Sequence, residues 1–172
     1  MTLLGRYQEK SLLRKLSKRI YAMNVYLHGT SQSILISENW HPVLQAEETA
    51  NDSDKTFTVP ASTEWEILSI WIELVTTADV GNRQITVEMQ DLSADVIGSF
   101  LAGKVQAASL TRNYMFAPGL QLMTDFVGTY LSFPLPPMFL PAGFKVRVYD
   151  SAAIQAAADD MVVQMVVAAR AV

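Results

Sequence analysis

The composition of this chain excludes several classes of function before any motif is considered. Its 172 residues contain no cysteine, which rules out disulfides, thiolate catalysis and cysteine-based zinc or iron–sulfur sites. No run approaches the roughly 18 uncharged apolar residues of a membrane-spanning helix, and the charged N-terminus does not fit a signal peptide. We therefore expect one domain with a short appendage, made in a cytoplasm-like compartment or assembled there into something larger.

The surface should be poor in charge. Charged residues make up only 17% of the chain, against the roughly 25% usual for globular proteins, while 50% is hydrophobic. Either other subunits cover part of this surface, or the protein is a compact monomer with an unusually apolar exterior. Residues 1–23 hold six basic residues and one acidic residue, whereas the rest holds seven basic and sixteen acidic residues. A basic arm on an acidic body can dock on an acidic neighbour, including a second copy.

Residues 1–28 are predicted to form a basic amphipathic helical arm. Thr2 can cap the helix, and apolar residues at three- and four-residue spacing predict a stripe along it. The stripe consists of Leu12, Leu13, Leu16, Ile20 and Met23. Three interpretations remain open for the arm: docking on a protein partner, contact with nucleic acid or an anionic membrane, and packing against its own domain.

Residues 29–55 are interpreted as an extended linker with a short strand at residues 33–37. Pro42 lacks an amide donor, so residues 40–44 cannot be a regular central strand. The polar run at residues 47–54 is expected to be an exposed loop. The sandwich itself is then predicted to span residues 56–172, beginning with a short strand at residues 56–60.

Residues 63–91 are predicted to form a β-hairpin around the turn at residues 79–82. Alternating apolar residues define one buried face, which comprises Leu68, Ile70, Ile72, Leu74, Ile85, Val87 and Met89. The opposite face of the first strand holds Trp65 and Trp71. Two indoles on this face indicate that it is covered as well, by a neighbouring subunit or by the N-terminal segment.

The remaining chain shows further extended segments. Residues 96–103 are typical of a strand interrupted by small residues, and residues 130–137 of a proline-edged extended segment. Residues 144–150 alternate strictly, with Val146 and Val148 facing inward. Residues 161–167 form a last strand that is apolar on both faces except at Gln164, after an alanine-rich connection.

The titratable residues do not define a catalytic or metal site. His28 and His41 are too few for zinc, whereas Asp150, Asp159 and Asp160 either hold a calcium ion or simply occupy turns. Ser99 and Ser109 lack a nucleophile elbow, and no glycine loop has the pattern of a phosphate site. Paired carboxylates for glycoside hydrolysis would have to come from Glu64, Glu66, Glu73 and Glu88, which are expected to be solvated.

Aromatic residues leave carbohydrate binding open. Exposed aromatics on a β-sandwich can stack on sugar rings, and five residues could form such a platform: Trp40, Trp65, Trp71, Tyr114 and Tyr130. The competing interpretation is that they pack inside the protein.

Four stretches resemble a known group of proteins. Val59-Pro60-Ala61, the run Trp65–Ile70, the run Val80–Gln84 and Leu140–Gly143 before Val146–Asp150 are similar to the small jelly-roll virion proteins of tailed bacteriophages. The resemblance covers roughly residues 56–167 and excludes the N-terminal arm. It implies an antiparallel two-sheet jelly-roll sandwich whose surfaces are bound by neighbours, as in capsid cement, collar, head-fibre and tail proteins.

We therefore expect a mainly β, non-enzymatic virion structural protein with an N-terminal α-helical arm. Its partners would be major capsid, portal or tail proteins and further copies of itself, a trimer being one option, with no cofactor, metal, specific nucleic acid or membrane. It would be made in the host cytoplasm and incorporated into the virion. The alternative is a carbohydrate-binding module of a host-recognition fibre. The residues expected to dock on partners are Leu12, Arg14, Leu16, Lys18, Ile20, Trp65 and Trp71.

Overall fold

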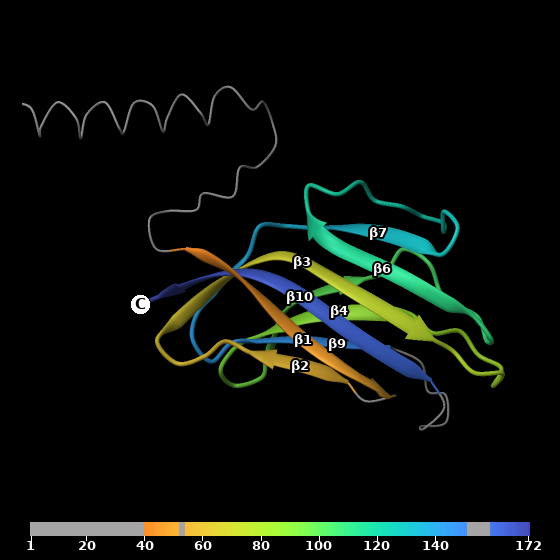
Figure 1. Cartoon of the computed structure of the whole chain (residues 1–172), viewed down its shortest axis with the longest axis horizontal. Coiled ribbons are helices and arrows are strands. Elements are labelled where there is room, and N and C mark those ends of the chain that lie inside the picture. Colours follow the sequence, from red (N-terminus) through yellow and green to blue (C-terminus); the bar gives the residue numbers. More distant parts are fainter. Residues whose placement is uncertain (1–39, 52–53, 151–158) are drawn as a thin grey trace, which may run out of the picture. The chain divides into compact units, whose positions relative to one another are not determined.

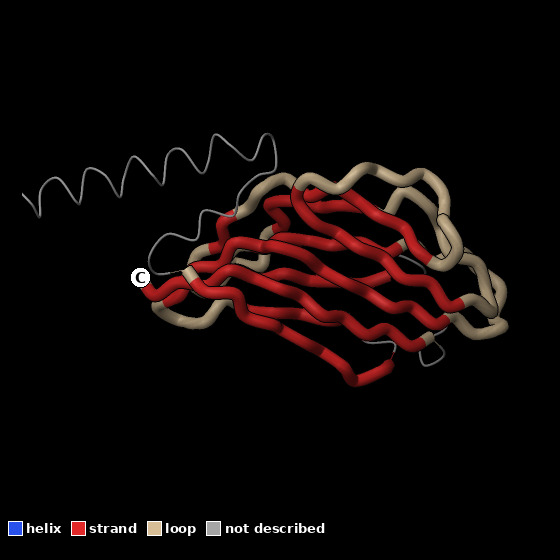
Figure 2. Tube along the Cα trace, turned by 45° about the horizontal axis from the view of Figure 1, so that its top comes forward, coloured by secondary structure: helices blue, strands red, loops and turns tan. Residues whose placement is uncertain are grey.

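The computed structural model describes residues 40–51, 54–150 and 159–172, and every regular element among them is a β-strand. All described residues belong to the unit of the chain that spans residues 36–172. The predicted arm at residues 1–28 and the predicted strand at residues 33–37 lie outside the described residues. The mainly β character and the two-sheet sandwich are confirmed (Figures 1 and 2).

The described residues form ten strands in two sheets. The first sheet has the order β1-β10-β3-β6-β7, with the short strand β8 also paired to β3. Its strands are β1 (His41–Asn51), β3 (Thr63–Val75), β6 (Thr111–Pro118), β7 (Tyr130–Leu135), β8 (Phe139–Leu140) and β10 (Asp160–Ala171). The second sheet has the order β2-β9-β4-β5. Its strands are β2 (Lys55–Thr58), β4 (Ile85–Gln90), β5 (Val96–Leu101) and β9 (Lys145–Asp150).

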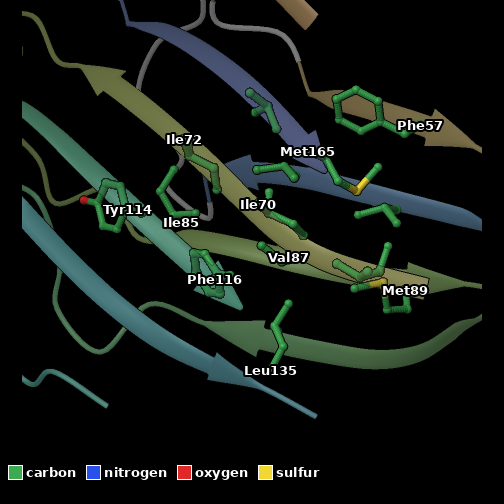
Figure 3. Packing of buried hydrophobic residues seen from close by; sticks show 14 of the residues in the cluster. Phe57, Ile70, Ile72, Ile85, Val87, Met89, Tyr114, Phe116, Leu135 and Met165 are labelled. Atoms are coloured by element: carbon green, nitrogen blue, oxygen red, sulfur yellow. The ribbon is translucent and has the colours of Figure 1, made fainter. Parts of the chain in front are cut away.

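The hydrophobic core lies between the inner faces of the two sheets (Figure 3). Successive side chains of a strand point to opposite faces, so alternate residues of each strand meet in this layer. The predicted inward positions Ile85, Val87 and Met89 are fully buried, as are Val146 and Val148. The alternation in these segments therefore identified the core correctly.

One β-bulge changes which residues of β3 face the core. Ile67 pairs with Val167 and Ser69 with the adjacent Val166, so Leu68 is an extra residue without a partner on β10. An extra residue inverts the alternation on one side of it. Trp65 and Ile67 therefore share the inner face with Ile70, and both are buried. The prediction that Leu68 faces inward and Trp65 faces outward was wrong because strict alternation does not allow for a bulge.

The predicted hairpin at residues 63–91 does not form. β3 pairs with β10 and β6 in the first sheet, whereas β4 pairs with β5 and β9 in the second. Residues 76–84 are the connection that crosses from one sheet to the other. Alternation shows that one face of each strand is buried, but it does not identify the neighbouring strand, and this is why the prediction failed.

The linker predicted at residues 29–55 is also corrected. Its second part forms β1, which pairs with β10 over most of its length. β1 lies at the end of its sheet, where a strand can contain a proline. The missing N–H of Pro42 therefore does not interrupt the hydrogen bonds between interior strands. Glu47 and its polar neighbours are accommodated because one face and one edge of an end strand are open to solvent. The sandwich therefore begins near residue 41 rather than at 56.

The resemblance implied that all strand pairs are antiparallel, and one pair departs from this. β6 and β7 run parallel, with Tyr114 opposite Leu131 and Phe116 opposite Phe133. Parallel neighbours need a crossover connection, which residues 119–129 provide. The other strand pairs of the described sheets are antiparallel.

A buried ion pair joins the connection between the sheets to the start of β10. The Arg83 guanidinium donates from Nε to Asp159 Oδ2 at 2.5 Å and from Nη2 to Oδ1 at 2.9 Å. Both side chains are almost inaccessible, with 0% and 4% exposure. Arg83 Nη1 also donates to the carbonyl oxygens of Asp79 and Gly81, and the backbone amide of Thr77 donates to the Asp159 carboxylate. The guanidinium thus holds the connection against the first sheet.

Gln106 extends this polar cluster. Its backbone exchanges two hydrogen bonds with the backbone of Arg83, at 2.7 and 2.8 Å. Its side-chain amide donates to the carbonyl oxygens of Leu74 and Leu110, and its carbonyl accepts from the Tyr114 hydroxyl. Burial raises the pKa of Tyr114, so the hydroxyl remains a donor to Gln106. The connections at this end of the sandwich are therefore held by satisfied buried polar groups.

The Arg83–Asp159 pair generates a prediction about stability and pH. Burial alone would raise the pKa of Asp159, but the hydrogen bonds from Arg83 and Thr77 outweigh burial and hold this pKa below its ordinary value of 3.8. The pair therefore stabilises the fold above about pH 3.8, and its contribution is lost as the pH falls from there through the folded-state pKa. Asp159→Asn should reduce the free energy of unfolding by about 3–5 kcal/mol at pH 7, because it leaves a buried guanidinium unpaired.

Urea denaturation of both proteins at pH 7 and at pH 3 tests this prediction. The difference between wild type and Asp159→Asn should shrink at the lower pH. Asp160→Asn is the matched control, because Asp160 is exposed and adjacent, and it should cost little at either pH. A loss for Asp159→Asn that stays constant with pH would contradict the account.

Candidate interaction surface

The outward-facing side chains of β1, β10, β3 and β6 form an apolar surface, which we call the outer face of the first sheet. Its apolar members are Leu44, Val162, Val166, Trp71 and Met115. The strand register places them side by side: Leu44 lies opposite Val166, and Trp71 lies between Gln164 on β10 and Met115 on β6. Leu44 is 58% exposed, and the other four are half-buried. No other described segment packs over them as a third layer, as Figures 1 and 2 show.

Polar residues lie among the apolar ones on this face: Ser69, Glu73, Gln164 and Asn113. Gln164 and Glu73 are on neighbouring strands, and Glu73 lies opposite Val162 and Asn113. An exposed apolar patch bordered by polar groups is typical of a surface that another protein covers.

An aromatic and charged cluster borders one end of the outer face. Arg170 donates to the Glu64 carboxylate at 2.6 and 2.8 Å, and its guanidinium lies 4.7 Å from the ring centre of Trp40. Trp40 in turn contacts Phe139, with ring centres 5.9 Å apart. Phe139 is 62% exposed, so it extends the apolar area beyond the strands that define the face.

The structure separates the two tryptophans predicted to contact partners. Trp71 lies on the outer face of the first sheet and is half-buried, in agreement with the predicted orientation. Trp65 is only 2% exposed and belongs to the core, so its assignment as a subunit contact was wrong. The bulge at Leu68 is the physical reason. The other predicted docking residues lie outside the described residues: Leu12, Arg14, Leu16, Lys18 and Ile20.

The aromatic residues considered for carbohydrate binding do not form one exposed platform. Trp40, Trp65 and Tyr114 are buried, with 8%, 2% and 1% exposure. Tyr130 is 60% exposed, and Trp71 is half-buried on a different strand. The packing interpretation is therefore correct for three of the five.

Three of the four carboxylates considered for catalysis lie on β3 in the first sheet, and Glu88 lies on β4 in the second. Glu73 belongs to β3 and Glu88 to β4, so they do not face each other as they would in a hairpin. Glu88 is only 8% exposed, contrary to the expected solvated position. It accepts hydrogen bonds from the Tyr149 hydroxyl at 2.6 Å and from Arg147 at 3.3 Å. The bond to Glu88, together with burial, raises the pKa of Tyr149.

Arg147 completes this cluster on the outer face of the second sheet. It bonds Asp54 at 2.5 and 2.9 Å and stacks over the Tyr149 ring, 4.4 Å from its centre. The hydrogen bond to Asp54 raises the pKa of Arg147, against the opposing effect of burial. Each charged group here has a partner of opposite charge, so the cluster stabilises the pairing of β2, β9 and β4.

The calcium interpretation of Asp150, Asp159 and Asp160 has no support in the geometry. Asp159 is engaged by Arg83, whereas Asp150 pairs with Ile85 and Asp160 with Val75 in different sheets. Across the described ranges, no three His, Cys, Asp or Glu side chains gather closely enough to hold a metal ion. None of these ranges contains a helix that is long and apolar enough to cross a membrane.

Sequence reasoning missed most of the outer face. Leu44 was assigned to a linker, and Val162, Val166 and Met115 were not recognised as neighbours of Trp71. A signal was present, because residues 161–167 are apolar at nearly every position. A strand that is apolar on both faces is covered on both sides.

Comparison with known proteins gives only distant structural similarities. No protein-family profile and no curated protein matches the chain. The fold is similar to part of dimeric latent PorU from Porphyromonas gingivalis, with TM-score 0.43 and 11% identity over 83% of this chain and 14% of PorU. It is also similar to part of a protein in the structure of infectious bursal disease virus, Gx strain, with TM-score 0.30 and 11% identity over 77% of this chain and 38% of that one. At these values neither protein defines a family or a function for this chain.

The different positions of the two tryptophans lead to a prediction. Trp65→Ala should lower the free energy of unfolding by about 3–5 kcal/mol, because it opens a cavity in the core. Trp71→Ala should cost clearly less, since part of its ring is already in contact with solvent. Chemical denaturation of the two variants measures both values. Equal losses would show that Trp71 is a core residue rather than part of an interaction surface.

Proposed function

We propose that the sandwich is a jelly roll and that the chain is a non-enzymatic structural protein of a bacteriophage particle. The strand order supports the jelly roll. β1 pairs with β10, β2 with β9, β3 with β6 and β4 with β5, in the sheets β1-β10-β3-β6 and β2-β9-β4-β5. This nested pairing is what results when one long antiparallel pair of chain halves wraps into two facing sheets. β7 and β8 are then an insertion between the sixth and the ninth strand.

The observation that carries the proposed role is the uncovered outer face of the first sheet. Trp71, Val166 and their neighbours are apolar, and the charged fraction of the whole chain is only 17%. Permanent burial between subunits removes the cost of exposing such a surface, and jelly rolls serve as building blocks of viral capsids. A capsid cement or decoration protein, or a head–tail or collar component, fits these properties.

The N-terminal arm is the second proposed contact. Its apolar stripe contains Leu12, Leu16 and Ile20, and Arg14 and Lys18 add positive charge. We assign it to docking on a major capsid, portal or tail protein, with the sandwich contacting further copies in a homo-oligomer. The chain would be made in the host cytoplasm and reach its place by assembly. The arrangement of the aromatic residues does not favour the carbohydrate-binding alternative.

The direct test is the protein content of purified particles. Mass spectrometry of particles of the phage that encodes this chain should find it at a copy number that matches a symmetric position on the head or tail. Its presence in infected-cell lysate but absence from purified particles would contradict the proposal.

The role of the arm is tested by deletion. A chain lacking residues 1–28 should keep the circular dichroism spectrum of a β-sandwich, because the two sheets described above do not require those residues for their strand pairing. Its incorporation into particles should be lost. The matched control is the full chain with Gln8→Ala, which changes neither the apolar stripe nor the charge of the arm. Unchanged incorporation of the deletion variant would contradict docking through the arm.

A further inference from the structure

The four end strands of the two sheets differ in how they are protected against pairing with another chain. An exposed sheet edge presents unpaired backbone groups, and proteins commonly block it with charge, proline, short strands or a covering loop. β1 contains Pro42 and Glu47, and β2 has only four residues. β7 contains Pro134, and its edge is covered where Met123 donates its amide to Ser132. Three of the four edges are therefore blocked.

β5 has a bulge at one end but lacks a charge, a proline and a covering loop among the described residues. Its sequence, Val96–Leu101, contains no charged residue and no proline. Val96, Ile97 and Leu101 are 52%, 51% and 46% exposed, which is unusual for three apolar residues on one short strand. A bulge at Ile97 interrupts the pairing with β4 and leaves residues 98–101 as the regular part of the edge. Within the described residues, no strand pairs with the outer side of β5.

The hydrogen bonds to β4 show which backbone groups of β5 are available. Ala102 donates its amide to the carbonyl oxygen of Ile85, at 2.8 Å. In an antiparallel ladder, alternate residues direct their amide and carbonyl groups to the same neighbour. Ser99 and Leu101 therefore direct theirs away from β4. These are the groups that a further strand would bind.

The chemistry of the edge favours a second copy of the same strand. When identical strands pair antiparallel across a two-fold axis, a residue on the axis meets its own copy, and every other residue meets the one that lies equally far on the other side of the axis. Like charges that meet in this way are unfavourable. Self-pairing of β1 would bring Glu47, near the middle of that strand, close to its own copy, whereas β5 contains no charged residue. Asp95 precedes β5 and Lys104 follows it, and both are exposed. An antiparallel pair brings Asp95 of one copy towards Lys104 of the other.

We propose that two copies of this chain pair their β5 strands antiparallel, so that their second sheets become one continuous sheet across a two-fold axis. The partner is thus a second copy of the chain, and the contact is separate from the outer face of the first sheet. Backbone hydrogen bonds of Ser99 and Leu101 hold the pair, and the exposed side chains of Val96, Ile97 and Leu101 become buried beside them. The proposal concerns the chain in solution and does not depend on the proposed role in a particle.

The test is the mass of the full-length chain in solution, measured by analytical ultracentrifugation at micromolar concentration. Wild type should sediment as a dimer, at twice the chain mass of 19.0 kDa. Ser99→Pro should sediment as a monomer, because proline removes the outward amide without removing a bond to β4. Ser99→Ala is the matched control, since it keeps the amide, and it should remain a dimer.

Further variants separate loss of pairing from loss of folding. If Ser99→Pro does not give a cooperative unfolding transition, Leu101→Lys replaces it. This variant places a charged side chain among the apolar side chains that the pairing would bury, so it should also be monomeric. Trp71→Lys should remain a dimer. A monomeric wild type, or a dimer that survives both Ser99→Pro and Leu101→Lys, would overturn the proposal. A dimer lost in Trp71→Lys would overturn it as well, and would assign the contact to the outer face of the first sheet.

Discussion

The ion pair between Arg83 and Asp159 is the interaction on which the arrangement of the two sheets depends. Arg83 stands at the end of the connection that carries the chain from β3 to β4, and Asp159 stands directly before β10. Thr77, at the other end of that connection, also binds Asp159. A single carboxylate therefore fixes the crossing between the sheets at both of its ends. Because the pair is buried, its loss would leave a charge without solvent or partner, which is costly.

The ion pair between Arg83 and Asp159 explains how the core and the outer surfaces are separated. With the crossing fixed, the inner faces of β3 and β4 meet in one layer, where Ile72, Ile85 and Val87 are fully buried. The outer face of β3 is then directed away from the core together with β10 and β1. Trp71 and Val166 remain there without a covering layer among the described residues. The proposed structural role follows from this uncovered face, and the proposed dimer follows from the unprotected edge of β5.

Sequence periodicity predicted the parts of the fold that depend on single strands. Val87, Met89, Val146 and Val148 were correctly placed in the core, because alternation determines which face of a strand is buried. It failed wherever the result depended on a neighbouring strand. The bulge at Leu68 moved Trp65 into the core, and the pairing of β3 with β10 rather than β4 is set by contacts between residues far apart in the sequence.

The candidate surface was only partly predictable for the same reason. Trp71 was recognised because an indole opposite a buried face needs a partner. Leu44 was missed because Pro42 and the polar residues later in β1 suggested a linker, although an end strand tolerates both. Asp159 was considered for a metal, and nothing in the sequence indicated that Arg83, 76 residues away, would bind it. Long-range pairs of this kind become visible only once the chain is folded.

In the proposed role, the outer face of the first sheet is buried by another protein in the assembled state. Cryo-electron microscopy of the purified particle tests this claim most directly, because it places each sandwich next to its neighbours. The account predicts that Trp71, Leu44 and Val166 lie within contact distance of an adjacent protein. A map in which the sandwich is present but this face is directed into solvent would contradict it.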